Sequence, residues 1–113
     1  MEINRVLAGV AVRDMEDAKR WYGTFFDRPP DAEPMPSLAD WYSPGGTLQV
    51  VLDEQRAGGS LVTIEVEDAR AALTELAARG GPQVELDETT SDKVLFATLA
   101  DPDGNGVTVV QTR

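Results

Sequence analysis

The sequence predicts an α+β domain made of two tandem βαβββ modules, and three observations support this. A weak internal repeat sets Val12-Arg13-Asp14 in the first half against Val66-Glu67-Asp68 in the second. Each tripeptide follows an apolar, β-branched segment and leads into a helical pattern. Short strand-like segments follow each helical pattern. We therefore expect one domain over residues 1–113, with module one at about 1–55 and module two at about 60–113.

Module one begins with a strand at 5–12, "RVLAGVAV". Asp14 is placed to cap a helix, because its side chain can accept a hydrogen bond from a free N–H of the first turn. The apolar residues from Met15 to Phe26 then recur on one helical stripe, and Pro29-Pro30 ends it. Strands are predicted at 32–35, 38–42 and 47–52, with "SPGG" (43–46) as a turn.

Module two follows a linker at 53–59 and repeats the order. A strand at 61–66 precedes Asp68, which is placed to cap the second helix. The apolar positions continue to Ala77, and "GGP" (80–82) marks the stop. The remaining strands are predicted at 83–86, 93–99 and 106–111.

The stretch "DPDGNGVTVVQT" (101–112) partly matches a calcium-binding loop, but its flanks favour a hairpin turn. A calcium loop of this type joins two helices and ends in a bidentate Glu, whereas here the segments on both sides are β-rich and the twelfth residue is Thr112. Pro102 followed by Asp103-Gly104 is typical of a tight turn.

The composition excludes several kinds of chemistry. The chain has no cysteine and no histidine, which removes disulfides, thiol nucleophiles and the commonest transition-metal ligand. A net charge of −10 argues against nucleic-acid binding and is compatible with simple solubility or with attraction of a cationic small molecule. No segment is long and apolar enough to span a membrane, and the first residues lack the features of a signal peptide, so a cytoplasmic location is expected.

Taken in order, these motifs resemble the vicinal oxygen chelate superfamily, which includes glyoxalase I, extradiol dioxygenases and bleomycin-resistance proteins. The motifs are the strand ending at Val12-x-Asp14, the helix bearing Trp21-Tyr22, the second junction at Val66-x-Asp68 and the Asp101-to-Asn105 turn. The resemblance covers essentially the whole chain. It implies curved mixed sheets around an open cleft, and it implies a homodimer.

Metal-using members of the superfamily place a His early in each module's first strand and a Glu on each module's last strand. The matching positions in this chain are Leu7, Leu61, Gln49 and Thr108. Two leucines, an amide and a hydroxyl are not the ligands that a divalent ion prefers. We therefore expect no metal and no cofactor, and no metal-dependent glyoxalase or dioxygenase activity.

Strand alternation, counted from these four positions, nominates the residues that line the cleft. Trp41 or its neighbour Tyr42 should also face the cleft, where an aromatic ring could stack on a planar ligand or, alternatively, could cap the core or an interface. Trp21 and Tyr22 are expected in the core. The nominated ligand-binding residues are Leu7, Gly9, Trp41, Gln49, Val51, Leu61, Thr63, Glu65, Thr108 and Val110, with Ala11 on the same strand face.

The carboxylate on the nominated face is Glu65, which could pair with a cation or act as a general base. Asp40 and Glu33 are weaker candidates. The leading hypothesis is a metal-independent protein of the bleomycin-resistance type that sequesters an aromatic or cationic compound. The alternatives are a metal-independent isomerase, lyase or cyclase that uses Glu65 or a tyrosine, and a dimeric module without a ligand.

Overall fold

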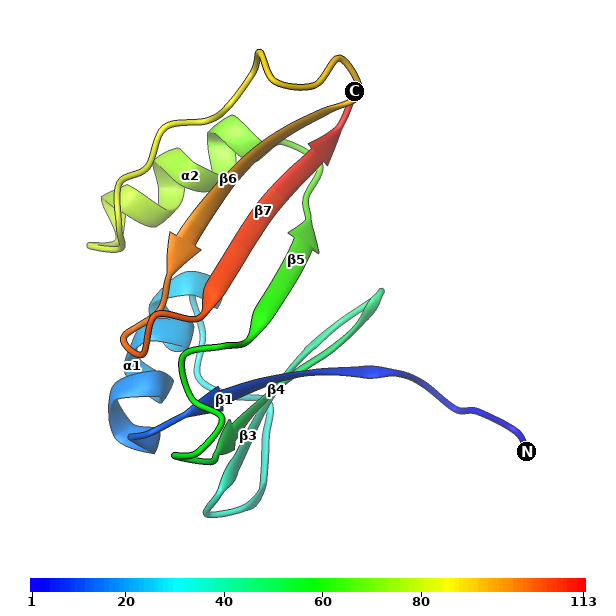
Figure 1. The fold of residues 1–113 in the computed structure, drawn as a ribbon, viewed down its shortest axis with the longest axis vertical. Helices are drawn as coiled ribbons and strands as arrows, with labels where there is room; N and C mark the ends of the chain where they lie inside the picture. Colours follow the sequence, from blue (N-terminus) through cyan, green and yellow to red (C-terminus); the bar gives the residue numbers. More distant parts are fainter.

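The computed structural model describes residues 1–113 and confirms the α+β class and the tandem repeat. The first half folds as β1 (Leu7–Val12), α1 (Met15–Phe26), β2 (Ala32–Met35), β3 (Leu38–Ser43) and β4 (Gly46–Leu52). The second half folds as β5 (Leu61–Glu65), α2 (Ala69–Ala78), β6 (Val94–Ala100) and β7 (Gly106–Thr112). Figure 1 shows these elements along the chain.

The strands form two mixed sheets whose registers are equivalent. The first sheet has the order β1-β4-β3-β2 and the second has the order β5-β7-β6. In each sheet the first strand of the half pairs in parallel with its last strand, so Gly9 lies beside Gln49 and Thr63 lies beside Thr108. The other neighbours are antiparallel. The repeat seen in the sequence is therefore a repeat of strand pairing.

The strand predicted at 83–86 does not form. Its residues alternate between exposed and half-buried positions, and Val84 and Leu86 pack against the core beneath α2. Pairing with β6 is limited to a single bridge between Asp87 and Phe96, whose N···O distances are 2.8 and 3.3 Å. The alternation of apolar residues thus predicted which side chains pack against the core. It did not predict that the segment lacks a partner strand.

Both helices begin and end where the sequence predicts. The side chain of Asp14 accepts a hydrogen bond from the Asp17 N–H at 3.0 Å, and that of Asp68 accepts one from the Ala71 N–H at 2.9 Å. After α2, Gly80 has a φ of 87°, and a Cβ on Gly81 would lie 2.5 Å from the Leu76 side chain. These two glycines let the chain reverse tightly against its own helix.

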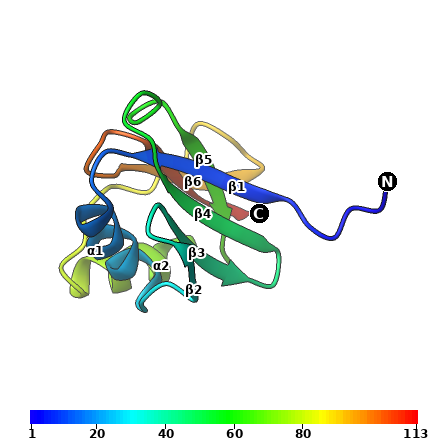
Figure 2. The same ribbon diagram turned by 90° about the horizontal axis from the view of Figure 1, so that it is seen from below.

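The helices cover the same side of the two sheets, as the views in Figures 1 and 2 agree. Under α1, Tyr22 and Trp41 are fully buried in a cluster that also includes Val62 of β5 and Val107 of β7. A second cluster lies under α2, and Trp21 and Phe25 of α1 pack against both. The core is therefore continuous across the two halves.

The 101–105 turn is the hairpin between β6 and β7, as predicted, and it also joins the two halves. The Asp101 carboxylate accepts hydrogen bonds from the Tyr22 hydroxyl and the Asn105 amide, each at 2.8 Å. Asn105 in turn donates to the carbonyl of Ala11 in β1 at 2.8 Å and accepts from the N–H groups of Gly58 and Ser60. We call residues 101–105 with these partners the junction turn.

Candidate functional site

The face of each sheet that turns away from the helices is covered by neither helix, and we call the two faces together the open face. Most of its side chains are exposed or half-buried, but Ala11, Asp40 and Thr47 are buried. Its members come from β1, β3 and β4 of the first sheet and from all the strands of the second sheet. On the first sheet they are Leu7, Gly9, Ala11, Leu38, Asp40, Tyr42, Thr47, Gln49 and Val51, and on the second Leu61, Thr63, Glu65, Phe96, Thr98, Thr108 and Val110.

The two halves of the open face meet where β1 and β5 contact each other. A direct link holds them there: the backbone N–H of Ala11 donates to the Ser60 hydroxyl at 3.0 Å, just before β5 begins. Both helices lie on the opposite side of the two sheets (Figure 2). The structure thus brings together residues that are about fifty positions apart in the sequence.

All the nominated ligand-binding residues except Trp41 lie on the open face. Leu61 is 76% exposed, although it is a large apolar residue at the start of β5. The hydroxyls of Thr98 and Thr108 hydrogen-bond to each other across β6 and β7 at 2.8 Å. The surface combines apolar side chains with a few hydrogen-bonding groups, a common composition for small-molecule sites.

The predicted place of Trp41 is wrong. Its side chain is fully buried under α1, where the ring stacks on Phe26 at 5.6 Å and the indole N–H donates to the Arg28 carbonyl at 3.0 Å. Alternation along β3 therefore puts Tyr42 on the open face instead. The Tyr42 ring lies 5.5 Å below the Arg5 guanidinium, and Arg5 also donates to the Thr47 hydroxyl at 3.5 Å.

The four positions that correspond to metal ligands do not fit a divalent ion. Leu7, Gln49, Leu61 and Thr108 all lie on the open face, and none offers a carboxylate or an imidazole. Nowhere in the chain do three or more Asp, Glu, His or Cys side chains gather in a metal-binding group. No step of a metal-dependent reaction can be derived from this set.

The carboxylates nominated from the sequence occupy three different environments. Glu65 lies on the open face and accepts a hydrogen bond from the Thr112 hydroxyl at 2.7 Å. Glu33 lies on the helix side of the sheet, where it pairs with Lys19 at 2.9 Å and raises the pKa of that ammonium group. This contact removes Glu33 from the candidate site.

Asp40, treated as a minor candidate, is the buried carboxylate of the open face. It lies in the middle of β3, opposite Gln49 on β4 and Ala32 on β2, and is only 2% exposed. Its Oδ1 atom accepts no hydrogen bond. A buried, unpaired carboxylate oxygen is rare and calls for an explanation.

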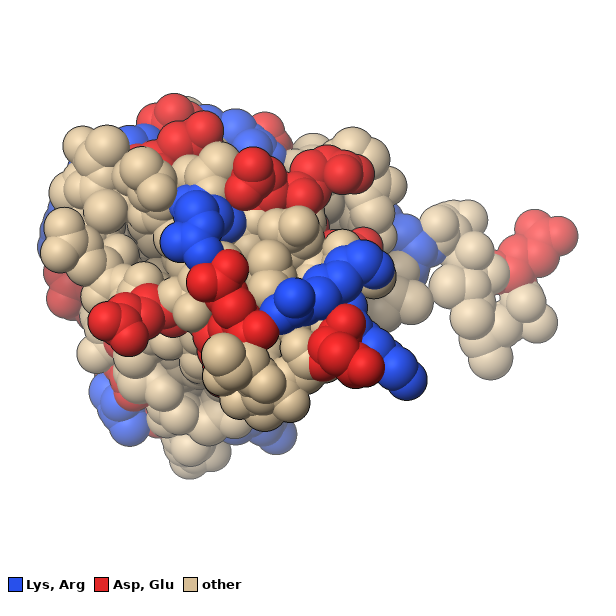
Figure 3. Space-filling view, turned by 90° about the horizontal axis from the view of Figure 1, so that it is seen from above, with Lys and Arg blue, Asp and Glu red and all other residues tan.

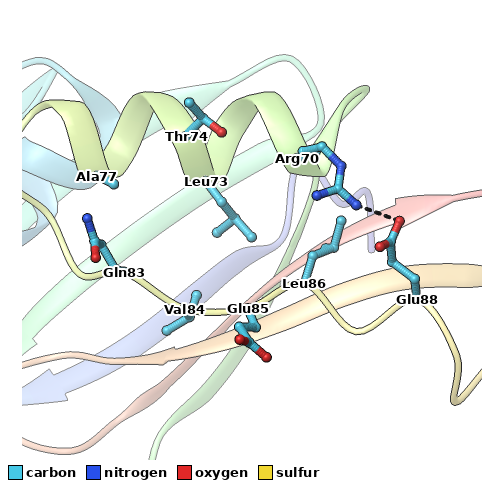
Figure 4. A pocket seen from close by; sticks show the side chains of 9 residues that line it. All are labelled: Arg70, Leu73, Thr74, Ala77, Gln83, Val84, Glu85, Leu86 and Glu88. Carbon is cyan, nitrogen blue, oxygen red and sulfur yellow. Dashed lines mark ion pairs between the residues drawn. The ribbon is translucent and has the colours of Figure 1, made fainter.

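A groove of about 570 Å³ lies elsewhere, between α2 and the extended segment 83–88 (Figure 4). Its apolar floor comes from Leu73, Ala77, Val84 and Leu86, and an ion pair between Arg70 and Glu88 at 2.6 Å bounds one end. Each partner holds the other in its charged form, so the pKa of Glu88 is lowered and that of Arg70 is raised. None of the nominated residues lines this groove.

The surface charges do not form a single acidic patch on the side that carries α2 and the C-terminus. Figure 3 shows acidic and basic side chains interspersed there. The ion pair of Arg70 with Glu88 is one such pair. On that face the acidic side chains are therefore accompanied by basic ones. No helix in the structure has the length and apolar character needed to cross a membrane.

Comparisons with solved structures support the fold over nearly the whole chain. A glyoxalase/bleomycin resistance protein from Catenulispora acidiphila shares 30% identity, with a TM-score of 0.87, over 96% of this chain and 98% of its own. An antibiotic-binding protein from a Streptomyces species shares 24% identity with a TM-score of 0.77, over 100% of this chain and 99% of its own. A lactoylglutathione lyase from Agrobacterium tumefaciens shares 15% identity with a TM-score of 0.75, over 97% and 95%.

The last two similarities show the fold alone, because their sequence identities are low. A search of curated proteins found no match. The family model described as a glyoxalase-like domain matches residues 7–110, a range that runs from the first residue of β1 nearly to the end of β7. The chain is a member of the glyoxalase-like domain family.

Proposed function

We propose that this protein binds a small organic molecule on the open face, without a metal ion. The observation that carries this proposal is the surface itself: two sheets that contact each other through β1 and β5 present apolar and hydrogen-bonding side chains on the side that no helix covers. The family resemblance matches Leu7, Gln49, Leu61 and Thr108 to metal-ligand positions, and none of these side chains is a ligand that a divalent ion prefers. The antibiotic-binding neighbour with the same fold is compatible with such a role.

We further propose that the binding unit is a homodimer. The open face exposes Leu61 by 76% and Tyr42 by 41%, and the N-terminal residues Ile3 and Val6 are also largely exposed. We infer that a second copy of the chain covers these exposed apolar side chains. A molar mass of one chain at micromolar concentration, measured by light scattering, would contradict the dimer.

A thermal-shift screen tests the binding proposal. Aromatic natural products, cationic antibiotics and small carbonyl compounds are added in excess chelator, and a binder at a hundred times its Kd should stabilise the fold by about 2.7 kcal/mol. The variant Gly9→Phe should abolish the shift, since a Cβ at Gly9 meets no atom within 4 Å and the ring would occupy the open face. Gly45→Phe, at an equally unobstructed glycine in the β3–β4 turn, is the matched control.

Two outcomes would contradict the binding proposal. The first is a shift that survives Gly9→Phe but disappears with Thr74→Trp, which fills the groove beside α2. The second is stoichiometric metal in the purified protein together with loss of binding in chelator. The first result would place the binding site in the groove beside α2. The second would show that binding depends on a metal ion.

The enzymatic alternative has a separate test at Glu65. If Glu65 acts as a general base in an isomerase, lyase or cyclase, Glu65→Gln should lower the rate about 10²–10⁴-fold. If it only contacts a ligand, the same change should weaken binding modestly. We favour the second result, because Glu65 is exposed and already accepts a hydrogen bond from Thr112.

A further inference from the structure

Asp40 combines three properties that seldom occur together in one side chain. It is 2% exposed, its Oδ1 atom accepts no hydrogen bond, and it lies on the face of the sheet that turns away from the helices. Leaving a buried charged oxygen without a donor is destabilising. A residue kept in that state at the centre of a sheet is a feature that a bound donor would explain.

The strand register places Asp40 in a row that runs across the first sheet. Gly9 of β1 is paired with Gln49 of β4, and Gln49 is paired with Asp40 of β3. Gly9 has no side chain, and the space above it is free of other atoms. The row therefore changes from an open position at Gly9, through an amide, to a buried carboxylate.

Gln49 is the residue directly opposite Asp40 on β4. Directly opposed residues on antiparallel strands have Cβ atoms about 4.5–5.5 Å apart, so the two side chains leave the sheet as neighbours on the same face. The Gln49 side chain is half-buried and makes no hydrogen bond within the chain. It can therefore turn aside without breaking one.

The charges of the open face have one sign. The register puts two ionisable carboxylates on it, Asp40 and Glu65, and puts no lysine or arginine on its strands. Arg5, which precedes β1, lies over the Tyr42 ring and donates to the Thr47 hydroxyl. A ligand that brings a positive donor to this surface meets no competing cation in the row.

We infer that Asp40 is the anchor for a protonated amine or amidinium group of the ligand, with the ligand's planar or apolar part lying over Gly9. This inference rests on the proposed binding function and narrows it to cationic compounds. An N–H donor of the ligand would supply the hydrogen bond that Oδ1 lacks, and the charge-assisted bond would form in a largely dry place. Asp40 thereby selects among ligands of similar shape.

The test compares two probes of nearly equal shape, 2-naphthylmethylamine and 2-methylnaphthalene, by titration of the ¹⁵N-labelled protein. Amide shifts at Gly9, Thr63 and Thr108 report occupancy of the open face. The amine should bind at least about tenfold more tightly than the hydrocarbon, and Asp40→Asn should remove most of that preference. Glu33→Gln is the matched control, since it changes the charge equally on the same hairpin, where Glu33 pairs with Lys19 on the other side.

The possible results separate this inference from the proposal on which it rests. If both probes shift the open-face amides and the wild-type protein shows no preference for the amine, Asp40 is not the anchor, although the binding site stands. If the preference is equally strong in Asp40→Asn, the inference is overturned in the same way. If neither probe shifts those amides, the binding proposal fails as well. The comparison of the two probes on the wild-type protein needs no variant. It can therefore refute the inference even if Asp40→Asn folds poorly.

Discussion

The junction turn and the open face each contain a buried carboxylate, but the two carboxylates differ in the hydrogen bonds that they accept. At the junction turn, Asp101 is 5% exposed and both of its oxygens accept hydrogen bonds, from the Tyr22 hydroxyl, the Asn105 amide and two backbone N–H groups. On the open face, Asp40 is 2% exposed and its Oδ1 atom accepts none. The first carboxylate is fully used by the fold, and the second is not.

This difference separates a structural motif from a candidate binding group. The "DPDGN" sequence looks like a ligand loop, but its Asp101 and Asn105 side chains are bonded to the chain itself. Asp40 has no sequence motif around it, yet it keeps a free acceptor. Changes at the two regions should therefore affect different properties, stability at the junction turn and recognition at the open face.

The largest effect is expected from Asn105→Ala. Asn105 is fully buried, and its amide bonds to Ala11 and Asp101 on one side and to Gly58 and Ser60 on the other. Losing it leaves several groups unpaired, so the free energy of unfolding should fall by about 3–4 kcal/mol. Urea denaturation measures this. Thr108→Ala is the control, since it removes one hydroxyl contact from the open face, and an equal loss in both variants would contradict the comparison.

The next effect concerns Tyr22, which stabilises the fold at neutral pH and loses this contribution at alkaline pH. Burial and the hydrogen bond to Asp101 raise the pKa of the Tyr22 phenol above its ordinary value of 10.0. A group with a raised folded-state pKa stabilises the fold fully below its unfolded-state pKa, and that stabilisation is lost as the pH rises. We expect wild-type stability to fall above about pH 10, and Tyr22→Phe to lower stability by about 1–2 kcal/mol at neutral pH while flattening the alkaline fall. An unchanged alkaline slope in Tyr22→Phe would show that other groups cause it.

Much of this architecture could be predicted from the sequence because its signals are local. Asp14 and Asp68 cap helices through backbone groups three residues away, and the glycines after α2 stop it within one turn. The strand predicted at 83–86 failed for the opposite reason. Val84 and Leu86 do point inward, but a strand also needs a partner at hydrogen-bonding distance, and β6 meets the segment only at Asp87.

The candidate site was harder to predict because it depends on distant residues. Counting alternation from Gln49 and Thr108 placed most of the open face correctly. The same parity could not be carried to β3 without knowing that Asp40, and not Trp41, is paired with Gln49. The state of Asp40 depends on the register of β3 with both β2 and β4, and the alternation of residues within β3 does not give that register. No local pattern contains that information.

A smaller effect, of opposite sign to that at Asn105, is expected from Asp40→Asn. Replacing a buried carboxyl group whose Oδ1 atom has no donor with an amide of the same shape should leave the free energy of unfolding unchanged or raise it by up to about 1 kcal/mol. Thermal and urea unfolding without ligand measure it. A loss of more than about 1 kcal/mol would mean that the Asp40 carboxylate serves the fold, as Asp101 does, and the contrast between the two regions would disappear.

The smallest effect on stability is expected from Leu61→Thr, although the side chain is large and apolar. Leu61 is 76% exposed, so truncating it removes little buried surface and should change the free energy of unfolding of the isolated chain by less than about 0.5 kcal/mol. Leu99→Thr is the matched control, because Leu99 is 2% exposed on the helix side of β6 and the variant should lose about 2 kcal/mol or more of its free energy of unfolding.

Light scattering and ligand titration then show whether Leu61 serves association or binding. If a second subunit or a ligand covers it, Leu61→Thr weakens that association while the fold keeps its stability. If Leu61→Thr changes neither association nor binding, the exposed part of β5 lies outside the working surface, and the site would have to be confined to the row from Gly9 to Asp40.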